Sequence, residues 1–197
     1  YATPAGLWQW SRQPGHAAPE TAASPPFTPG RSCIILIPAM KFHITTMGCQ
    51  MNVGDGDWLT RSLVSQGFTP APEDQAELFI LFTCSVRDKP EQKVASELGR
   101  IADRHGGNPR AFVAVGGCTA QQIGTALWRR FPMVRLVFGT DGLAAAPRAL
   151  ARIADEPGLR LSLLDFTESY PEREQTWPED RLPPKAFVSI MQGCDNF

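Results

Sequence analysis

The stretch LFILFTCSVRD, residues Leu78–Asp88, indicates the fold class of this chain. Its first five residues, Leu78–Phe82, are all apolar, as expected of a strand that is covered on both faces of a parallel sheet. A loop begins at Thr83, and Pro90 then lies just inside a helix that is predicted to continue to about Arg104. Strand, loop and helix in this order predict one unit of an α/β fold.

The same unit recurs before and after this stretch. We expect strands at residues 41–46, 111–115 and 134–138, and helices at about 55–66 and 120–130, with an alanine-rich helix ending near Ala154. Alternating strands and helices of this length predict an α/β class with a mostly parallel sheet flanked by helices, since parallel crossovers require them. In such sheets, ligands bind beside the loops that leave the carboxyl ends of the strands.

Three of the four predicted strands have a cysteine just past their end: Cys49, Cys84 and Cys118. A single cysteine is most often a small buried residue, and this alternative applies to each of them. The repeated position favours a common site, because neighbouring strands would bring the three thiols to one edge of the sheet. The fourth loop, Gly139–Gly142, contains no cysteine.

Three thiols at one edge indicate a soft metal or a metal cluster. Structural zinc sites mostly use four ligands in closely spaced pairs, and the chain has no Cys-x-x-Cys pair, although an open zinc site with a bound water remains an alternative. A 4Fe-4S cluster fits thiol ligands without histidine better, and three ligands would leave one iron open. His43 lies within the first predicted strand and is expected to be a packing or edge residue.

The chain contains four cysteine motifs: GCQMN at Gly48–Asn52, TCSVRDKPEQKV at Thr83–Val94, GGCTAQQ at Gly116–Gln122 and FVSIMQGCDNF at Phe187–Phe197. Together these motifs resemble the tRNA methylthiotransferase family. They occur in the family's order, and the resemblance covers nearly everything from Met40 onward. The QMN and SVRDKPEQK forms are similar to the branch that modifies isopentenyladenosine next to the anticodon. A methylthiotransferase acting on a ribosomal protein or on another tRNA is the alternative within the family.

The resemblance implies a role for four cysteines. Cys49, Cys84 and Cys118 would bind an auxiliary 4Fe-4S cluster, and Cys194 would be the first of three ligands of a second 4Fe-4S cluster that binds S-adenosylmethionine. Cleavage of S-adenosylmethionine would supply the radical that activates an adenine C-H bond. The family's two further ligands would follow beyond Phe197, so we expect this chain to be inactive alone. Phe82 stands where family members commonly have Asn, which alters the expected polar surroundings of the auxiliary cluster.

The expected organisation has four parts. The proline-rich residues 1–39 are interpreted as a disordered extension upstream of a native start at Met40. Residues 40–158 would form the auxiliary-cluster domain and residues 159–184 a strand and linker. Residues 185–197 would be the truncated start of a radical-SAM barrel.

Charge and hydropathy limit the partners. The formal net charge is -1, and no apolar run approaches the roughly 18 residues of a membrane span. We expect a cytoplasmic monomer that binds tRNA mostly through domains outside this chain. A free-standing zinc or partner-binding module is the alternative from another class. Arg87, Lys89 and Lys93 are expected either to contact RNA or to be solvated at the start of a helix. Gln121 and Gln122 are expected either to lie near the cluster or to fill the first turn of a helix. Trp58 and Trp128 are expected to pack in the core.

Overall fold

The computed structural model describes residues 40–85 and 89–166 of the 197-residue chain. Within these residues six strands form one sheet in the order β2-β1-β3-β4-β5-β6, and every neighbouring pair is parallel. The predicted α/β class is therefore confirmed. The strands are β1 (Lys41–Thr46), β2 (Thr69–Pro70), β3 (Leu78–Thr83), β4 (Phe112–Gly117), β5 (Val134–Phe138) and β6 (Leu161–Leu163).

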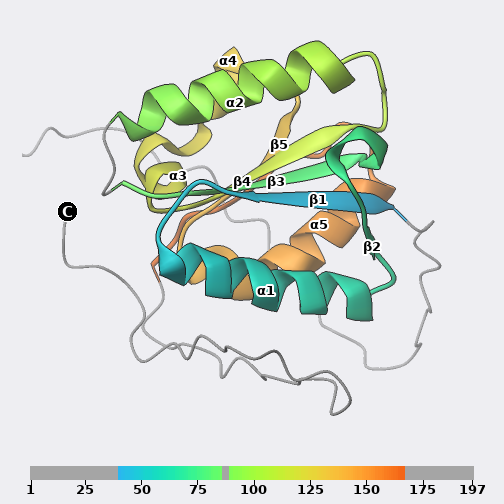
Figure 1. Ribbon diagram of the computed structural model, residues 1–197, viewed down its shortest axis with the longest axis horizontal. Helices are drawn as coiled ribbons and strands as arrows, with labels where there is room; N and C mark the ends of the chain where they lie inside the picture. Colours follow the sequence, from blue (N-terminus) through green and yellow to red (C-terminus); the bar gives the residue numbers. More distant parts are fainter. Residues whose placement is uncertain (1–39, 86–88, 167–197) are drawn as a thin grey trace, which may run out of the picture. The chain divides into compact units, whose positions relative to one another are not determined.

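Helices cover both faces of the sheet (Figure 1). One layer contains α1 (Gln50–Ser65) and α5 (Ala146–Asp155). The other contains α2 (Pro90–His105), α3 (Cys118–Ile123) and α4 (Leu127–Arg130). Short 3-10 turns connect them: η1 (Glu73–Gln75), η2 (Gly124–Ala126) and η3 (Asp141–Ala145).

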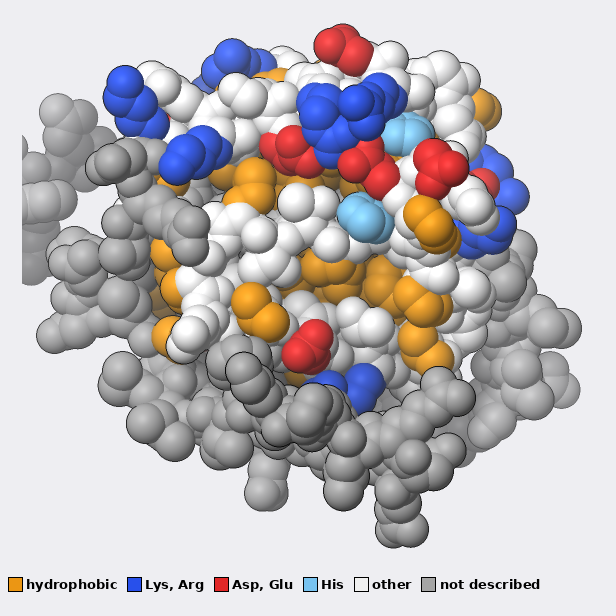
Figure 2. Space-filling model, viewed as in Figure 1, with side chains coloured by type: hydrophobic (Ala, Val, Ile, Leu, Met, Phe, Trp, Pro, Cys, Tyr) orange, Lys and Arg blue, Asp and Glu red, His pale blue; other side chains and the backbone are white. Residues whose placement is uncertain are grey.

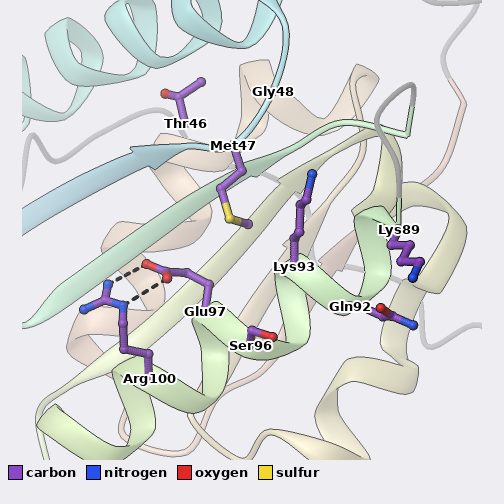
Figure 3. A pocket seen from close by; sticks show the side chains of 9 residues that line it. All are labelled: Thr46, Met47, Gly48, Lys89, Gln92, Lys93, Ser96, Glu97 and Arg100. Carbon is purple, nitrogen blue, oxygen red and sulfur yellow. Dashed lines mark hydrogen bonds and ion pairs between the residues drawn. The ribbon is translucent and has the colours of Figure 1, made fainter.

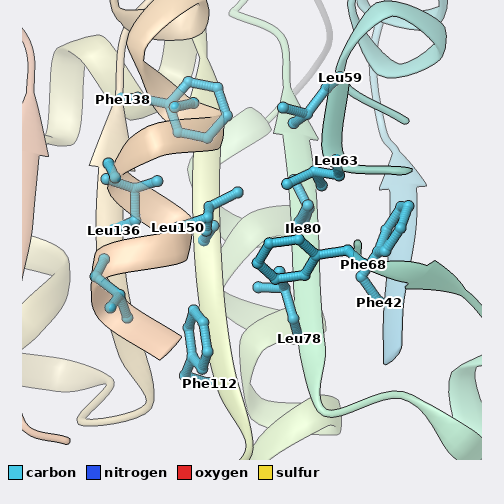
Figure 4. Packing of buried hydrophobic residues seen from close by; sticks show 14 of the residues in the cluster. Phe42, Leu59, Leu63, Phe68, Leu78, Ile80, Phe112, Leu136, Phe138 and Leu150 are labelled. Carbon is cyan, nitrogen blue, oxygen red and sulfur yellow. The ribbon is translucent and has the colours of Figure 1, made fainter. Parts of the chain in front are cut away.

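Two hydrophobic cores result, one on each face of the sheet. All six residues of β3 are buried, as predicted for a strand covered on both sides. Because successive side chains point to opposite faces, Ile80 packs in the core with α1 and α5 (Figure 4). Phe79 packs in the other core, with α2. Trp58 and Trp128 are partly buried against the two cores, so their predicted packing role is confirmed.

The helix boundaries differ from the sequence prediction in two places. Helix α1 begins at Gln50 rather than near residue 55. Its first turns carry no apolar period, because Met51 and Val53 are exposed and the buried residue between them is the polar Asn52. The predicted helix 120–130 is broken into α3, η2 and α4, where Gly124 adopts a positive φ of 59°.

The carboxyl end of β4 also differs from the prediction. Gly116 and Gly117 belong to the strand, and Cys118 is the first residue of α3, so no separate loop precedes the helix. Strand β6 lies in the segment predicted to hold a strand and linker. The predicted extension 1–39 and residues 185–197, the predicted start of a radical-SAM barrel, lie outside the described residues.

Candidate functional site at the carboxyl edge of the sheet

The three predicted site cysteines follow three adjacent strands. Strands β1, β3 and β4 are neighbours in the sheet, with β3 in the middle. Cys49 immediately precedes α1, Cys84 follows β3, and Cys118 begins α3. None of the three forms a disulfide; Cys84 is buried, and the other two are partly exposed. The expected neighbourhood of the strands is therefore present, and it brings the three segments to one edge.

Two glycines allow these segments to touch. A Cβ atom at Gly48 would lie 3.1 Å from the Cβ of Cys84 and only 1.9 Å from the side-chain nitrogen of Asn52. A Cβ atom at Gly117 would lie 2.3 Å from the carbonyl oxygen of Thr83, and Gly117 has a positive φ of 97°. Only glycine fits at either position without displacement. The segments of Cys49 and Cys118 are thus each in contact with the segment of Cys84.

Thr83 joins the three segments by hydrogen bonds. Its hydroxyl donates to the carbonyl oxygen of Gly116 at 2.7 Å and accepts from the backbone N-H of Ala120 at 3.1 Å. Its own carbonyl oxygen accepts from the amide nitrogen of Asn52 at 2.9 Å. Thr83 and Asn52 are only 1% and 4% exposed. Sequence reasoning missed both residues, although each is a polar residue within a cysteine motif.

The chemistry of the three thiols limits which metal or cluster this edge could hold. Within residues 40–85 and 89–166, no three Cys, His, Asp or Glu side chains are arranged to hold a single metal ion. The thiols are soft ligands, which suit zinc or an iron-sulfur cluster rather than magnesium or calcium. Next to Cys118, the hydroxyl of Thr119 is fully buried and has no hydrogen-bond partner among the described residues. A buried hydroxyl without a partner is uncommon in proteins. The three thiols themselves are the feature of this edge that would suit an iron-sulfur cluster.

Two other predicted candidates have partners away from the cysteines. His43 lies in β1, and its Nδ1 donates to the carbonyl oxygen of Ala71 at 3.1 Å, which agrees with an edge residue rather than a ligand. The side chain of Gln121 donates to the carbonyl oxygen of Leu164 at 2.7 Å and so ties α3 to the segment after β6. Gln122 is exposed.

A groove of about 790 Å³ runs beside this edge, between the β1-α1 loop and the first turns of α2 (Figure 3). Met47 and Gly48 line one side, and Lys89 and Lys93 line the other. At its far end, Arg100 pairs with Glu97. Figure 2 shows Lys and Arg side chains gathered over this part of the surface, with acidic side chains among them farther along α2. The groove therefore has a positively charged end close to the cysteine segments.

Part of the predicted site lies outside the described residues. This applies to Arg87 and to Cys194, the expected ligand of a second cluster. In the described part of the chain, no helix is long and apolar enough to cross a membrane.

These features define a parallel α/β domain with three cysteine-bearing segments in contact at the carboxyl edge of its sheet. Residues 41–139 match the model of a family described as Uncharacterized protein family UPF0004, and the chain belongs to this family. A protein of Nitratidesulfovibrio vulgaris (strain DP4), named tRNA-2-methylthio-N(6)-dimethylallyladenosine synthase, is 64% identical over 79% of this chain and 35% of its own length.

Two further relatives carry the same name. The protein of Oleidesulfovibrio alaskensis is 57% identical over 79% of this chain and 34% of its own length. The protein of Lawsonia intracellularis is 49% identical over 80% of this chain and 36% of its own length. The resemblance inferred from the motifs is thus confirmed, and the chain spans about a third of the length of the curated relatives it matches.

Proposed function

We propose that this chain is the N-terminal part of a radical-SAM tRNA methylthiotransferase that adds a methylthio group to the adenine ring of isopentenyladenosine next to the anticodon. The observation that carries the proposal is the contact between the segments of Cys49, Cys84 and Cys118 in a chain that is 64% identical to a protein named as such a synthase. Both the elements and the motifs of the domain support the same family.

In this proposal, Cys49, Cys84 and Cys118 are the ligands of an auxiliary 4Fe-4S cluster. A four-iron cluster binds each thiolate through a different iron atom, so it requires thiols around a common space rather than around one ion. When bound, the cluster would carry the sulfur that is transferred. The protein's own contribution is to hold the three ligand segments together through Thr83, Asn52 and the two glycines.

The remaining parts of the enzyme are proposed from the family. Cys194 would be the first ligand of the second 4Fe-4S cluster, which binds S-adenosylmethionine, and residues 185–197 would begin the radical-SAM domain. Residues 40–158 would form the auxiliary-cluster domain, to whose sheet β6 adds a strand. Lys89 and Lys93 are candidates for contact with tRNA phosphates, while most tRNA contacts would come from other domains. We also propose a cytoplasmic monomer that is inactive as this chain alone.

Anaerobic reconstitution with ferrous iron and sulfide tests the cluster assignment. The full chain is expected to turn brown and to bind about four irons. Cys84→Ala is expected to abolish this uptake, because it removes the ligand in the middle of the three. Cys33→Ala is the matched control, since Cys33 lies outside the three motifs, and it should leave iron uptake unchanged. Iron, sulfide and the absorption spectrum are measured on the same samples.

Two results would contradict the proposal. A colourless protein that takes up one zinc instead of iron would favour the zinc alternative. Iron uptake that survives Cys84→Ala would show that the three cysteines are not the ligand set.

The substrate is tested separately, by mass spectrometry of tRNA from cells that depend on the full-length protein. Loss of the methylthio group in the Cys84→Ala strain is expected, and an unchanged modification level would exclude this role.

A further inference from the structure

We propose that Thr83 and Asn52 form a hydrogen-bonded lock that sets the relative positions of the three cysteine segments and thereby slows the loss of the bound cluster. Neither side chain is a ligand, and both act as positioning residues. The inference rests on the proposed function, because it concerns the cluster assigned to Cys49, Cys84 and Cys118.

The hydroxyl of Thr83 connects β3 to the segment of Cys118. Its single hydrogen is donated to the carbonyl oxygen of Gly116, so its oxygen is free to accept a hydrogen bond from the N-H of Ala120 in the first turn of α3. Gly116 and Ala120 lie on either side of Cys118 in the sequence. The hydroxyl therefore holds the backbone on both sides of this ligand, and it does so from the residue next to Cys84.

The side chain of Asn52 connects the segment of Cys49 to the same point. It lies in the first turn of α1, and its amide donates to the carbonyl oxygen of Thr83. The amide also lies directly against Gly48, where a Cβ atom would be 1.9 Å from its nitrogen. A movement of the Cys49 segment would break this contact or carry Thr83 with it. All three ligand segments are consequently linked through one residue.

Such a lock matters for a cluster more than for a buried thiol. A cluster held by three protein ligands is lost when one ligand segment moves away. Mutation of residues that position metal ligands through hydrogen bonds typically lowers metal affinity by about 10- to 100-fold. Valine has nearly the shape of threonine but has neither a donor nor an acceptor. Thr83→Val would leave the buried N-H of Ala120 without the acceptor it has in this structure.

The experiment compares iron release to a chelator from the anaerobically reconstituted full chain. Thr83→Val is expected to release iron at least about tenfold faster than the unaltered chain, whereas Thr83→Ser, which keeps the hydroxyl, should stay within about twofold. Thr60→Val is the matched control, since Thr60 also uses its hydroxyl in a backbone hydrogen bond, to Gly56 within α1. The reduction potential and the electron paramagnetic resonance spectrum of the reduced cluster are recorded for each variant. A change in the reduction potential or the spectrum that appears in Thr83→Val but not in Thr83→Ser identifies the hydroxyl as the cause.

Each outcome decides either the lock or the proposed function. Failure of the unaltered chain to take up iron and sulfide contradicts the proposed function itself. A stable cluster with equal release rates in the unaltered chain and Thr83→Val overturns the lock alone, as does Thr83→Ser releasing iron as fast as Thr83→Val. If Thr83→Val does not fold, Asn52→Leu provides the same comparison, because it removes the donor to Thr83 at similar volume. Its release rate should also rise about tenfold, and an unchanged rate rejects the lock.

Discussion

Gly116 faces the ring of Phe138, and the space between them admits no side chain. A Cβ atom at Gly116 would lie 2.1 Å from the ring, and both residues are buried. We predict that Gly116→Ala lowers the free energy of unfolding by about 1–3 kcal/mol, because the ring must shift within a packed core. Urea unfolding followed by circular dichroism measures the change.

Gly99 offers the matched control for this substitution. It lies in the interior of α2, and a Cβ atom there would meet nothing within 4 Å. Gly99→Ala should raise the free energy of unfolding by up to about 1 kcal/mol, since alanine favours the helix. Equal effects of the two substitutions would show that the contact with Phe138 does not determine the requirement for Gly116.

The cysteines of the site could be predicted from the sequence, but the residues that hold them could not. Cys49, Cys84 and Cys118 were recognisable because each lies just past the end of a predicted strand, and strand patterns are local features. The role of Thr83 depends on which strands are neighbours and on where α3 begins. A single polar residue at a strand end has many possible partners, so its hydrogen bonds followed only from the assembled sheet.

At the level of elements, the ion pair of Glu73 and Arg100 fastens η1 to α2. Arg100 donates to both carboxylate oxygens, and this hydrogen bonding holds the pKa of Glu73 below its usual 4.5. A carboxylate whose pKa is lowered on folding stabilises the fold above its unfolded pKa, and the effect is lost as the pH falls through the lower folded pKa. The contribution is therefore present at neutral pH and disappears in acid.

We predict that Glu73→Gln lowers the free energy of unfolding by about 1 kcal/mol or less near pH 7, because both side chains of the pair are partly exposed. The difference from the unaltered chain should shrink as the pH falls below 4.5 and through the lowered pKa of Glu73. Urea unfolding from neutral to acidic pH measures it. Asp74→Asn, on the same turn, removes a negative charge without removing a member of the ion pair, and it is the control for loss of charge at neutral pH. A difference that stays constant with pH would contradict the assignment to Glu73.

The elements themselves were predictable to different degrees. The strands β3, β4 and β5 were located to within a few residues, since strands covered on both faces are mostly apolar. The strand β1 was located as well, although it is only partly buried and carries polar residues. The start of α1 was missed, because the turns that follow Cys49 expose Met51 and Val53 and show no helical period. The two-residue strand β2 is too short to have a pattern of its own.

For the whole molecule, the site joins parts of the chain that are far apart in sequence. Cluster binding should therefore stabilise the fold, because the unfolded chain cannot offer the three ligands together. We predict that reconstitution raises the midpoint of thermal unfolding by several degrees, measured anaerobically. Cys84→Ala should show no increase under the same conditions. An unchanged midpoint in a chain that has bound its cluster would contradict preferential binding to the folded state.

Phe82, Phe138 and Gly116 depend on one another for their packing near this edge of the sheet. It lies edge-on to Phe138, with ring centroids 5.8 Å apart, and Phe138 fills the space that any side chain at Gly116 would need. The effects of substitutions at these three positions should therefore be non-additive. Replacing Phe82 with Asn would bury an amide against the ring of Phe138.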